Sequence, residues 1–176
     1  MASTSSNPQS SNPLAAKPGQ PGIDPRGPRF GATITVVLLA IDVVLGLTGV
    51  STTSGTTLAQ RVADPAFILL VILTVIFAWG AFAGIQRHPY GVIFKKFIRP
   101  NLSAPSELED PKPPTFAQLI GFIVAGAGLV LGAFAVPYGV AGAAAAAFVA
   151  AFLNAAFAFC LGCQMYLGLK RFGVIR

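Results

Sequence analysis

Four apolar stretches, each long enough to cross a membrane, constrain the fold of this chain more than any other feature. They cover residues 30–50, 65–85, 116–136 and 140–169. A transmembrane helix needs about 20 mostly apolar residues to span the hydrocarbon core. Hydrophobic residues make up 54% of the chain and charged residues only 10%, as expected when the outer surface contacts lipid. The sequence therefore predicts an all-α integral membrane protein built as a four-helix bundle.

The basic residues predict how this bundle is oriented. Eleven of the twelve lysines and arginines lie before the first stretch, between the second and third, or after the fourth. Only Arg61 lies in a loop on the opposite side. Cytoplasmic loops of membrane proteins carry the excess of positive charge, so we expect both termini and the central loop to be cytoplasmic. The net charge of +6 then faces anionic lipid, and it does not indicate a nucleic-acid partner.

Outside the spans, the sequence divides into tails and one long loop. Residues 1–28 are rich in Ser, Pro and Gly, so we expect a disordered cytoplasmic tail. The membrane domain then covers residues 29–172, and residues 173–176 form a short second tail. Within the cytoplasmic loop at residues 86–115, residues 91–99 combine apolar and basic side chains as an interfacial helix does.

The same loop continues into an acidic stretch with Glu107, Glu109 and Asp110, which neighbouring prolines keep extended. Two interpretations stay open for this stretch. It is either a solvated connector or a docking strip for a cytoplasmic partner.

Cys160 and Cys163 are the only cysteines, and they form a Cys-Leu-Gly-Cys motif near the end of the fourth stretch. Two thiols this close are able to form a disulfide, to carry a sulfur atom or to bind a metal ion. Counting back from Lys170, we expect both within the membrane, below the headgroups and on one face of the helix. A regular helix does not bring their Cβ atoms close enough for a disulfide, so Gly162 is expected to allow local unwinding.

Two interpretations of the pair stay open: redox or sulfur-transfer chemistry, and packing of two small side chains between helices. Metal binding is disfavoured, because a tetrahedral site needs four ligands. The only histidine, His88, is expected at the cytoplasmic end of the second helix. We therefore predict no metal and no cofactor.

Asp42 is the second candidate, because a carboxyl group inside a membrane is costly and often functional. Counting along the helices from Arg29 and from Lys170 places Asp42 and Asn154 near the bilayer middle, where they can face each other. Asp42 either handles a proton or ion, or it is a protonated structural link, hydrogen-bonded to Asn154 or Thr48.

Four blocks of this sequence, at residues 22–30, 99–111, 113–118 and 159–163, resemble a family of small bacterial membrane proteins known as domain of unknown function 4395. The family is common in actinobacteria, and the resemblance covers residues 23–172. It implies this topology, the cysteine motif, a bacterial plasma membrane location, and thioredoxin-like proteins or sulfurtransferases as neighbours.

Together these observations predict a membrane component of thiol redox or sulfur-transfer metabolism that uses Cys160 and Cys163. Its expected partners are the lipid bilayer and a cytoplasmic thioredoxin-like or sulfurtransferase protein. A small transporter or channel subunit that uses Asp42 is the alternative, and a non-catalytic assembly subunit is the third. Whether the protein is an enzyme, and whether it assembles with copies of itself, stay open.

Overall fold

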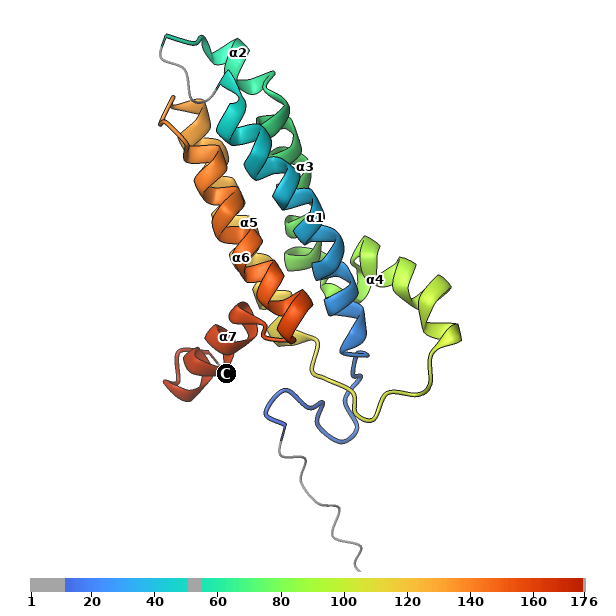
Figure 1. Cartoon of the computed structure of the whole chain (residues 1–176). Helices are drawn as coiled ribbons and strands as arrows, with labels where there is room; N and C mark the ends of the chain where they lie inside the picture. Colours follow the sequence, from blue (N-terminus) through green and yellow to red (C-terminus); the bar gives the residue numbers. More distant parts are fainter. Residues whose placement is uncertain (1–11, 51–54, 176) are drawn as a thin grey trace, which may run out of the picture.

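The computed structural model describes residues 12–50 and 55–175, and this part of the chain is helical apart from turns, loops and two isolated β-bridges (Figure 1). Four of the described helices are long and apolar enough to span a membrane. They are α1 (Arg26–Thr48), α3 (Pro65–Ala83), α5 (Lys112–Ala133) and α6 (Gly139–Phe157). The predicted all-α membrane bundle is therefore confirmed.

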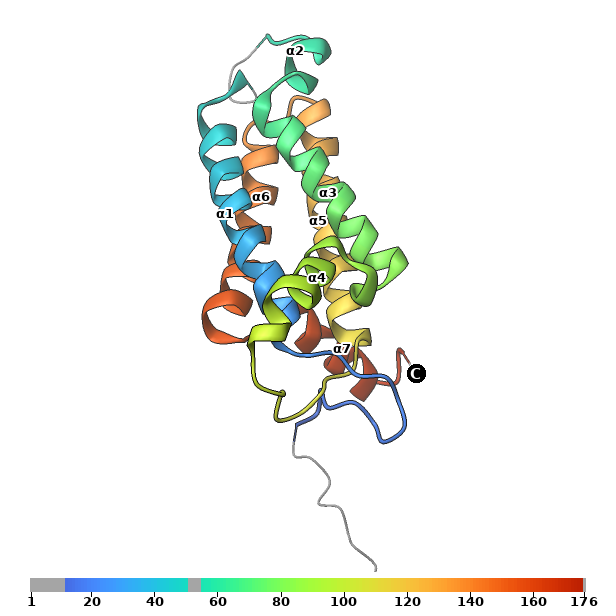
Figure 2. The same cartoon turned by 90° about the vertical axis from the view of Figure 1, so that its right-hand side faces the viewer.

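The bundle consists of two closely packed helix pairs, α1 with α6 and α3 with α5 (Figure 2). Small residues allow the backbones to approach each other. A Cβ atom on Gly46 of α1 would lie 3.2 Å from the backbone of Ala141 in α6, and one on Gly128 of α5 would lie 2.4 Å from Cβ of Ala143. Leu39, Leu70, Leu73 and Val140 fill the centre.

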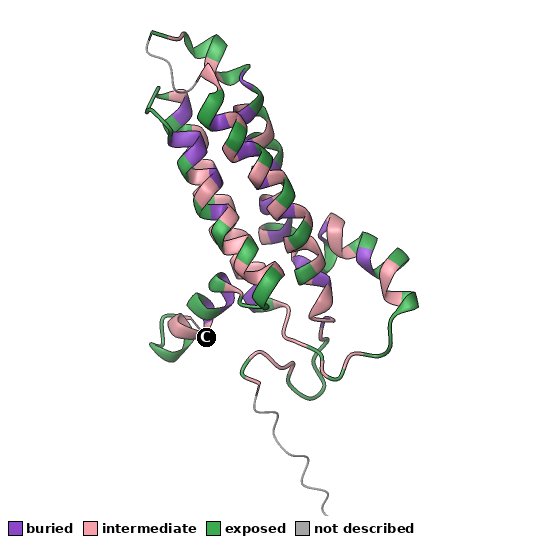
Figure 3. Ribbon diagram, in the orientation of Figure 1, coloured by how far each residue is buried: buried purple, intermediate pink, exposed green. Residues whose placement is uncertain are grey.

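The outer surface of the bundle is apolar, as a lipid-facing surface should be. Exposed residues recur along each long helix among buried and partly buried ones (Figure 3). Many of the exposed side chains are large and hydrophobic, among them Val37, Val44, Val75, Trp79 and Val149. In water such a surface would be a liability, but in lipid it is the normal exterior of a membrane protein.

The end of the bundle that carries few charges is closed by short connections. Asp64 begins α3 by accepting a hydrogen bond from the Ala66 N–H, and it also accepts one from the Val50 N–H at 2.7 Å. Arg61, in the short helix α2 (Leu58–Val62), donates to the carbonyl of Ala133 at the end of α5. A cation at a helix C-terminus is stabilised by the free carbonyl groups there.

The fourth predicted span, residues 140–169, is wrong as a single helix. The structure divides it into α6 and a separate helix, α7 (Leu161–Arg171), which turns away from the bundle (Figure 1). Ala158 adopts a left-handed conformation with φ of 56° and ends α6. The N–H groups of Ala158 and Phe159 then donate to the carbonyls of Asn154 and Leu153, as backbone groups do at helix ends.

The helix predicted in the central loop is present. It begins as α4 (Pro89–Ile93) and continues through a π-helical turn, Phe94–Ile98, into Arg99–Asn101. Phe94 is buried against Phe30 of α1, whereas Phe97 is exposed beside Lys96. This arrangement leaves apolar and basic side chains exposed together, as in a helix that lies on a membrane surface.

The predicted disordered tail at residues 1–28 is wrong for its second half. Residues 1–11 lie outside the described residues, but residues 12–25 pair with the central loop, and α1 already begins at Arg26. Ile23 and Glu109 exchange two backbone hydrogen bonds of 2.9 Å, and the Asp110 N–H donates to the Leu14 carbonyl. The acidic stretch is therefore paired with the chain's own N-terminal segment and is not a free connector.

Candidate thiol-disulfide site

A disulfide joins Cys160 to Cys163, and their Cα atoms are 5.2 Å apart. Cys160 is the N-cap of α7, and its Sγ accepts a hydrogen bond from the Cys163 N–H at 3.2 Å. The prediction that both cysteines lie inside the fourth span is wrong, because α6 ends at Phe157. The bend at Ala158 releases Cys160 from helical geometry, and this lets the sulfurs meet without unwinding at Gly162.

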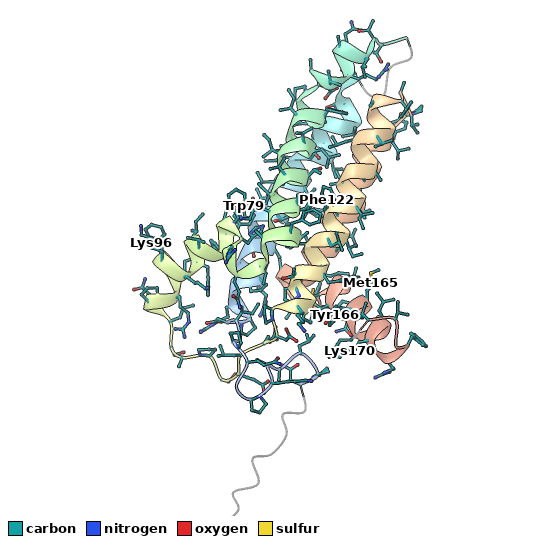
Figure 4. The ribbon with its side chains drawn as sticks, turned by 180° about the vertical axis from the view of Figure 1, so that it is seen from behind. Trp79, Lys96, Phe122, Met165, Tyr166 and Lys170 are labelled. Atoms are coloured by element: carbon teal, nitrogen blue, oxygen red, sulfur yellow. A yellow bond between two sulfur atoms is a disulfide. The ribbon has the colours of Figure 1, made fainter. Side chains whose placement is uncertain are left out.

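Gly162 has a different role, which is to bring α7 against α5. A Cβ atom at this position would lie 2.5 Å from both Cα and Cβ of Ala117, closer than packed atoms approach. The ring centroids of Tyr166 in α7 and Phe116 in α5 are 5.7 Å apart, so this aromatic pair adds to the contact between the two helices. Figure 4 shows Tyr166 where α7 meets the start of α5.

The two cysteines differ in accessibility. Cys163 is buried, with 3% of its surface exposed, while Cys160 is partly exposed. A thiol from another molecule would therefore meet Cys160 first. Cys163 would then be the sulfur that leaves.

Both cysteines line a cavity of about 140 Å³, which is enclosed by the N-terminal segment, the central loop and parts of α1, α5, α6 and α7. Its polar walls come from Arg26 and Arg29 at the start of α1, Glu109 of the central loop and Asn154 of α6. Asp24 holds the Arg26 guanidinium at 2.7 Å. Arg29 donates to the Ala155 carbonyl at 3.4 Å, a weak contact that leaves its charge available. A nearby guanidinium stabilises the thiolate form of a cysteine, and so do the N–H groups at a helix N-terminus.

Glu109 adds a group that can exchange protons to this cavity. Burial raises the pKa of its carboxyl above the ordinary value, and the nearby Glu107 charge acts in the same direction. A hydrogen bond from Asn12 lowers the pKa in part. A carboxyl group with a raised pKa beside a thiol pair is suited to receiving or returning a proton during exchange.

His88 lies outside the cysteine cavity and has a structural role as the N-cap of α4. It is 3% exposed, and its Nδ1 accepts a hydrogen bond from the Tyr90 N–H at the start of α4. Burial lowers the pKa of this histidine, opposed by the nearby Ile76 carbonyl. Within the described residues, no three His, Cys, Asp or Glu side chains gather closely enough to hold a metal ion.

Asp42 and Asn154 do not come together, so the predicted contact between them is wrong. Asp42 is fully buried, and neither carboxyl oxygen has a hydrogen-bond partner within the described residues. Gly46 packs against Ala141, which places Asn154 about 13 Å further along the bundle than Asp42. Thr48 does not bond to Asp42 either, since its hydroxyl donates to the carbonyls of Val44 and Leu45. Asn154 belongs instead to the wall of the cysteine cavity.

Sequence reasoning missed the roles of Arg29 and Glu109, which are 80 positions apart. They share a cavity because the N-terminal segment pairs with the central loop. No periodic pattern in the sequence predicts the pairing of these two segments. A weak signal existed, since both residues lie in the blocks that carried the family resemblance.

These features define a multi-pass membrane protein with a cysteine pair at the basic end of its helix bundle. A family model described as a domain of unknown function, DUF4395, matches residues 23–171, and the chain belongs to that family. No curated protein and no solved structure matches it.

Proposed function

We propose that this protein is a membrane-bound component of thiol redox or sulfur-transfer metabolism in which Cys160 and Cys163 are the reacting groups. The observation that carries the proposal is their position. The two sulfurs lie within bonding reach of each other, at the start of α7 and outside the spanning helices, in a cavity with Arg29 and Glu109 in its wall.

The exchange step follows from the accessibility of the two sulfurs. A thiolate of a dithiol partner attacks Sγ of Cys160, the bond between Cys160 and Cys163 breaks, and Cys163 leaves as a thiolate. The second thiol of the partner then attacks the mixed disulfide and releases Cys160. The partner ends as a disulfide, and this protein ends as a dithiol with two electrons and two protons gained. In the sulfur-transfer form, the thiolate of a reduced cysteine attacks the outer sulfur of a persulfide on the partner; the S–S bond of the partner breaks, its cysteine leaves as a thiolate, and the persulfide is now on this protein.

The location belongs to the same proposal. The basic residues lie at the end of the bundle where α1 and α5 begin and α3 and α6 end, apart from Arg61. The positive-inside rule makes this the cytoplasmic side of a bacterial plasma membrane. A cytoplasmic thioredoxin-like or sulfurtransferase protein then has direct access to Cys160.

Two mirrored single-cysteine variants test the proposal. Cys163→Ser leaves the partly exposed Cys160, and Cys160→Ser leaves the buried Cys163. In the purified protein in lipid nanodiscs, oxidised glutathione should form a mixed disulfide about tenfold faster or more with the first variant than with the second. Mass spectrometry measures both rates, and thiosulfate with a sulfurtransferase replaces glutathione to detect a persulfide. If neither variant reacts until the protein is unfolded, the cysteines only pack.

Asp42 supports a second candidate, a transporter or channel subunit, because its carboxyl group is fully buried without a hydrogen-bond partner in the described part of the chain. Such a group inside a membrane is costly to keep without a function. This candidate requires that Asp42→Asn abolish function in cells while a Cys160→Ser/Cys163→Ser protein retains it. The thiol proposal requires the reverse. An assembly subunit stays the third candidate, although the acidic stretch, which was open to interpretation as a docking strip, is paired with residues 14–23.

A further inference from the structure

A second cavity lies directly beside the cysteine cavity, inside the bundle. Its volume is about 260 Å³, and it is enclosed by α1, α3, α5, α6 and the first turns of α7. Asn154, Pro28 and Pro114 line both cavities, so the two share a wall. Leu161 and Gly162, the two residues between the cysteines, line the larger cavity.

The walls of the larger cavity are mostly small and apolar. They include Ala117 and Gly121 of α5 and Ala147, Ala150 and Ala151 of α6. Among the described residues, three polar side chains line it: Thr35, Gln118 and Asn154. Small-molecule sites typically combine an apolar pocket with a few polar groups that fix the orientation of the ligand.

Two of the three polar groups are able to bind a ligand. The Thr35 hydroxyl already donates to the Gly31 carbonyl. Gln118 has a buried Oε1 without a hydrogen-bond partner among the described residues, and its amide nitrogen is a donor. Asn154 offers a second amide next to the cysteines. An amide can donate to a carbonyl oxygen of a ligand, and it can accept from the hydroxyl that forms when that carbonyl is reduced.

Access to the cavity is from the side of the bundle. Ala146 of α6 and Met165 of α7, which line it, are exposed on the molecular surface. Figure 4 shows Met165 beside Tyr166 where α7 meets the bundle. Ala146 lies within a candidate spanning helix, so in a bilayer this side would face lipid, and a ligand dissolved in the membrane could enter without crossing water.

We propose that this cavity binds the ring of a membrane quinone, which accepts the electrons of the reduced cysteine pair; this inference rests on the proposed thiol function. The volume approaches the lower end of the roughly 300–1,000 Å³ range of small-molecule sites. It suits a planar ring whose apolar tail extends into the lipid. Amide groups bind the ring carbonyls, and the small apolar residues contact its faces.

The reaction is balanced as a two-electron transfer. The S–H bonds of Cys160 and Cys163 break, and a bond forms between the two sulfurs. The two electrons pass to the quinone ring, and the two protons pass to its carbonyl oxygens, which become the hydroxyls of a quinol. Glu109, in the wall of the cysteine cavity, is placed to hold one of these protons in transit. A cytoplasmic dithiol then reduces the cysteine pair again.

The experiment uses the full chain in lipid nanodiscs, reduced with dithiothreitol and freed of excess reductant. A short-tailed naphthoquinone is added, quinol formation is followed by absorbance, and free thiols are trapped with a maleimide. One quinol should form per disulfide. Ala150→Leu, which fills the cavity, should slow the reaction about tenfold or more, and Gln118→Leu should slow it by removing the amide. Ala156→Leu is the matched control, because Ala156 is exposed on the same helix outside the cavity wall, and it should react like the unaltered protein.

Diamide, a small thiol oxidant that does not need the cavity, separates the two proposals. If diamide forms the disulfide in all variants but the quinone does not, or if Ala150→Leu reacts with the quinone as fast as Ala156→Leu, the quinone site is disproved while the thiol function stands. If neither oxidant forms the disulfide in the folded protein, the thiol function itself fails.

Discussion

Gly162 is the residue on which the position of α7, and with it the cysteine pair, depends most directly. Replacing it with alanine places a Cβ atom 2.5 Å from Ala117 of α5. Overpacking of this kind typically costs about 1–3 kcal/mol, so Gly162→Ala should lower the free energy of unfolding in detergent and expose Cys163 to maleimide after reduction.

Gly168 on the same helix is the matched control for this prediction. A Cβ atom there meets nothing within 4 Å, so Gly168→Ala should stabilise α7 by about 0.5–1 kcal/mol. Equal effects of the two substitutions would show that α7 does not rest on α5 as described.

His88 should make stability depend on pH. Its pKa is lowered by burial in the folded protein, so below the ordinary value of about 6.5 the unfolded chain takes up a proton that the folded chain resists. Stability should therefore fall as pH drops from 7.5 toward 5.5. His88→Asn keeps a residue able to cap α4 and should flatten this part of the profile, measured as the thermal midpoint at each pH. An unchanged slope would show that other groups cause it.

The candidate site residues differ in how well the sequence predicts their positions. The sequence was sufficient to single out Cys160, Cys163 and Asp42 as candidates, because each is an unusual residue type for its position, and their roles stay predictions. It placed Asn154 at the wrong depth, because the count along the helix assumed that no break lies between Asn154 and Lys170. The backbone turns at Ala158, so the count fails.

At the scale of elements, the N-terminal segment at residues 12–25 and the loop around residues 99–110 form one unit, which Asp24 connects. Its carboxylate contacts Arg26 at 2.7 Å and Arg99 at 2.8 Å, and the hydrogen bond from Arg26 holds its pKa below the ordinary value. Asp24→Asn should raise amide hydrogen exchange in residues 14–23 and 103–110 and leave the four spanning helices unchanged. The connection should persist at pH 5 in the unaltered protein and fail only as pH falls through the lowered pKa. Equal hydrogen exchange of these two segments in the variant and the unaltered protein would contradict the proposed role of Asp24.

The helices themselves were largely predictable, since hydropathy alone locates three of the four spans. The fourth was overextended for a physical reason. Residues 157–161 read Phe-Ala-Phe-Cys-Leu, which contains no glycine, proline or charge to mark a helix end. The break instead depends on Ala158 accepting a left-handed conformation, which packing of α7 on α5 must stabilise. Likewise, the pairing of residues 14–23 with residues 108–110 is a long-range contact between two segments that look disordered on composition.

For the whole molecule, the charge asymmetry predicts which ends are accessible from each side of the membrane. In a Cys160→Ser/Cys163→Ser background, Ala59→Cys in α2 should react with an impermeant maleimide in intact spheroplasts. Gln164→Cys in α7 should react only after the membrane is opened. Both positions are exposed in the structure, so burial does not explain a difference between them. The opposite pattern would place the cysteine pair outside the cell and exclude a cytoplasmic partner.

The most direct test of the central claim is the redox state of Cys160 and Cys163 in intact membranes. Thiols are trapped with a maleimide before and after a mild oxidant and after a dithiol reductant, and the mass of the protein reports how many have reacted. A working pair predicts that Cys160 is labelled after reduction, that neither thiol is labelled after oxidation, and that the change reverses fully without unfolding. Cysteines that stay unlabelled in every state until the protein is denatured, or that never form the disulfide, would contradict a thiol function and make Asp42 the leading candidate.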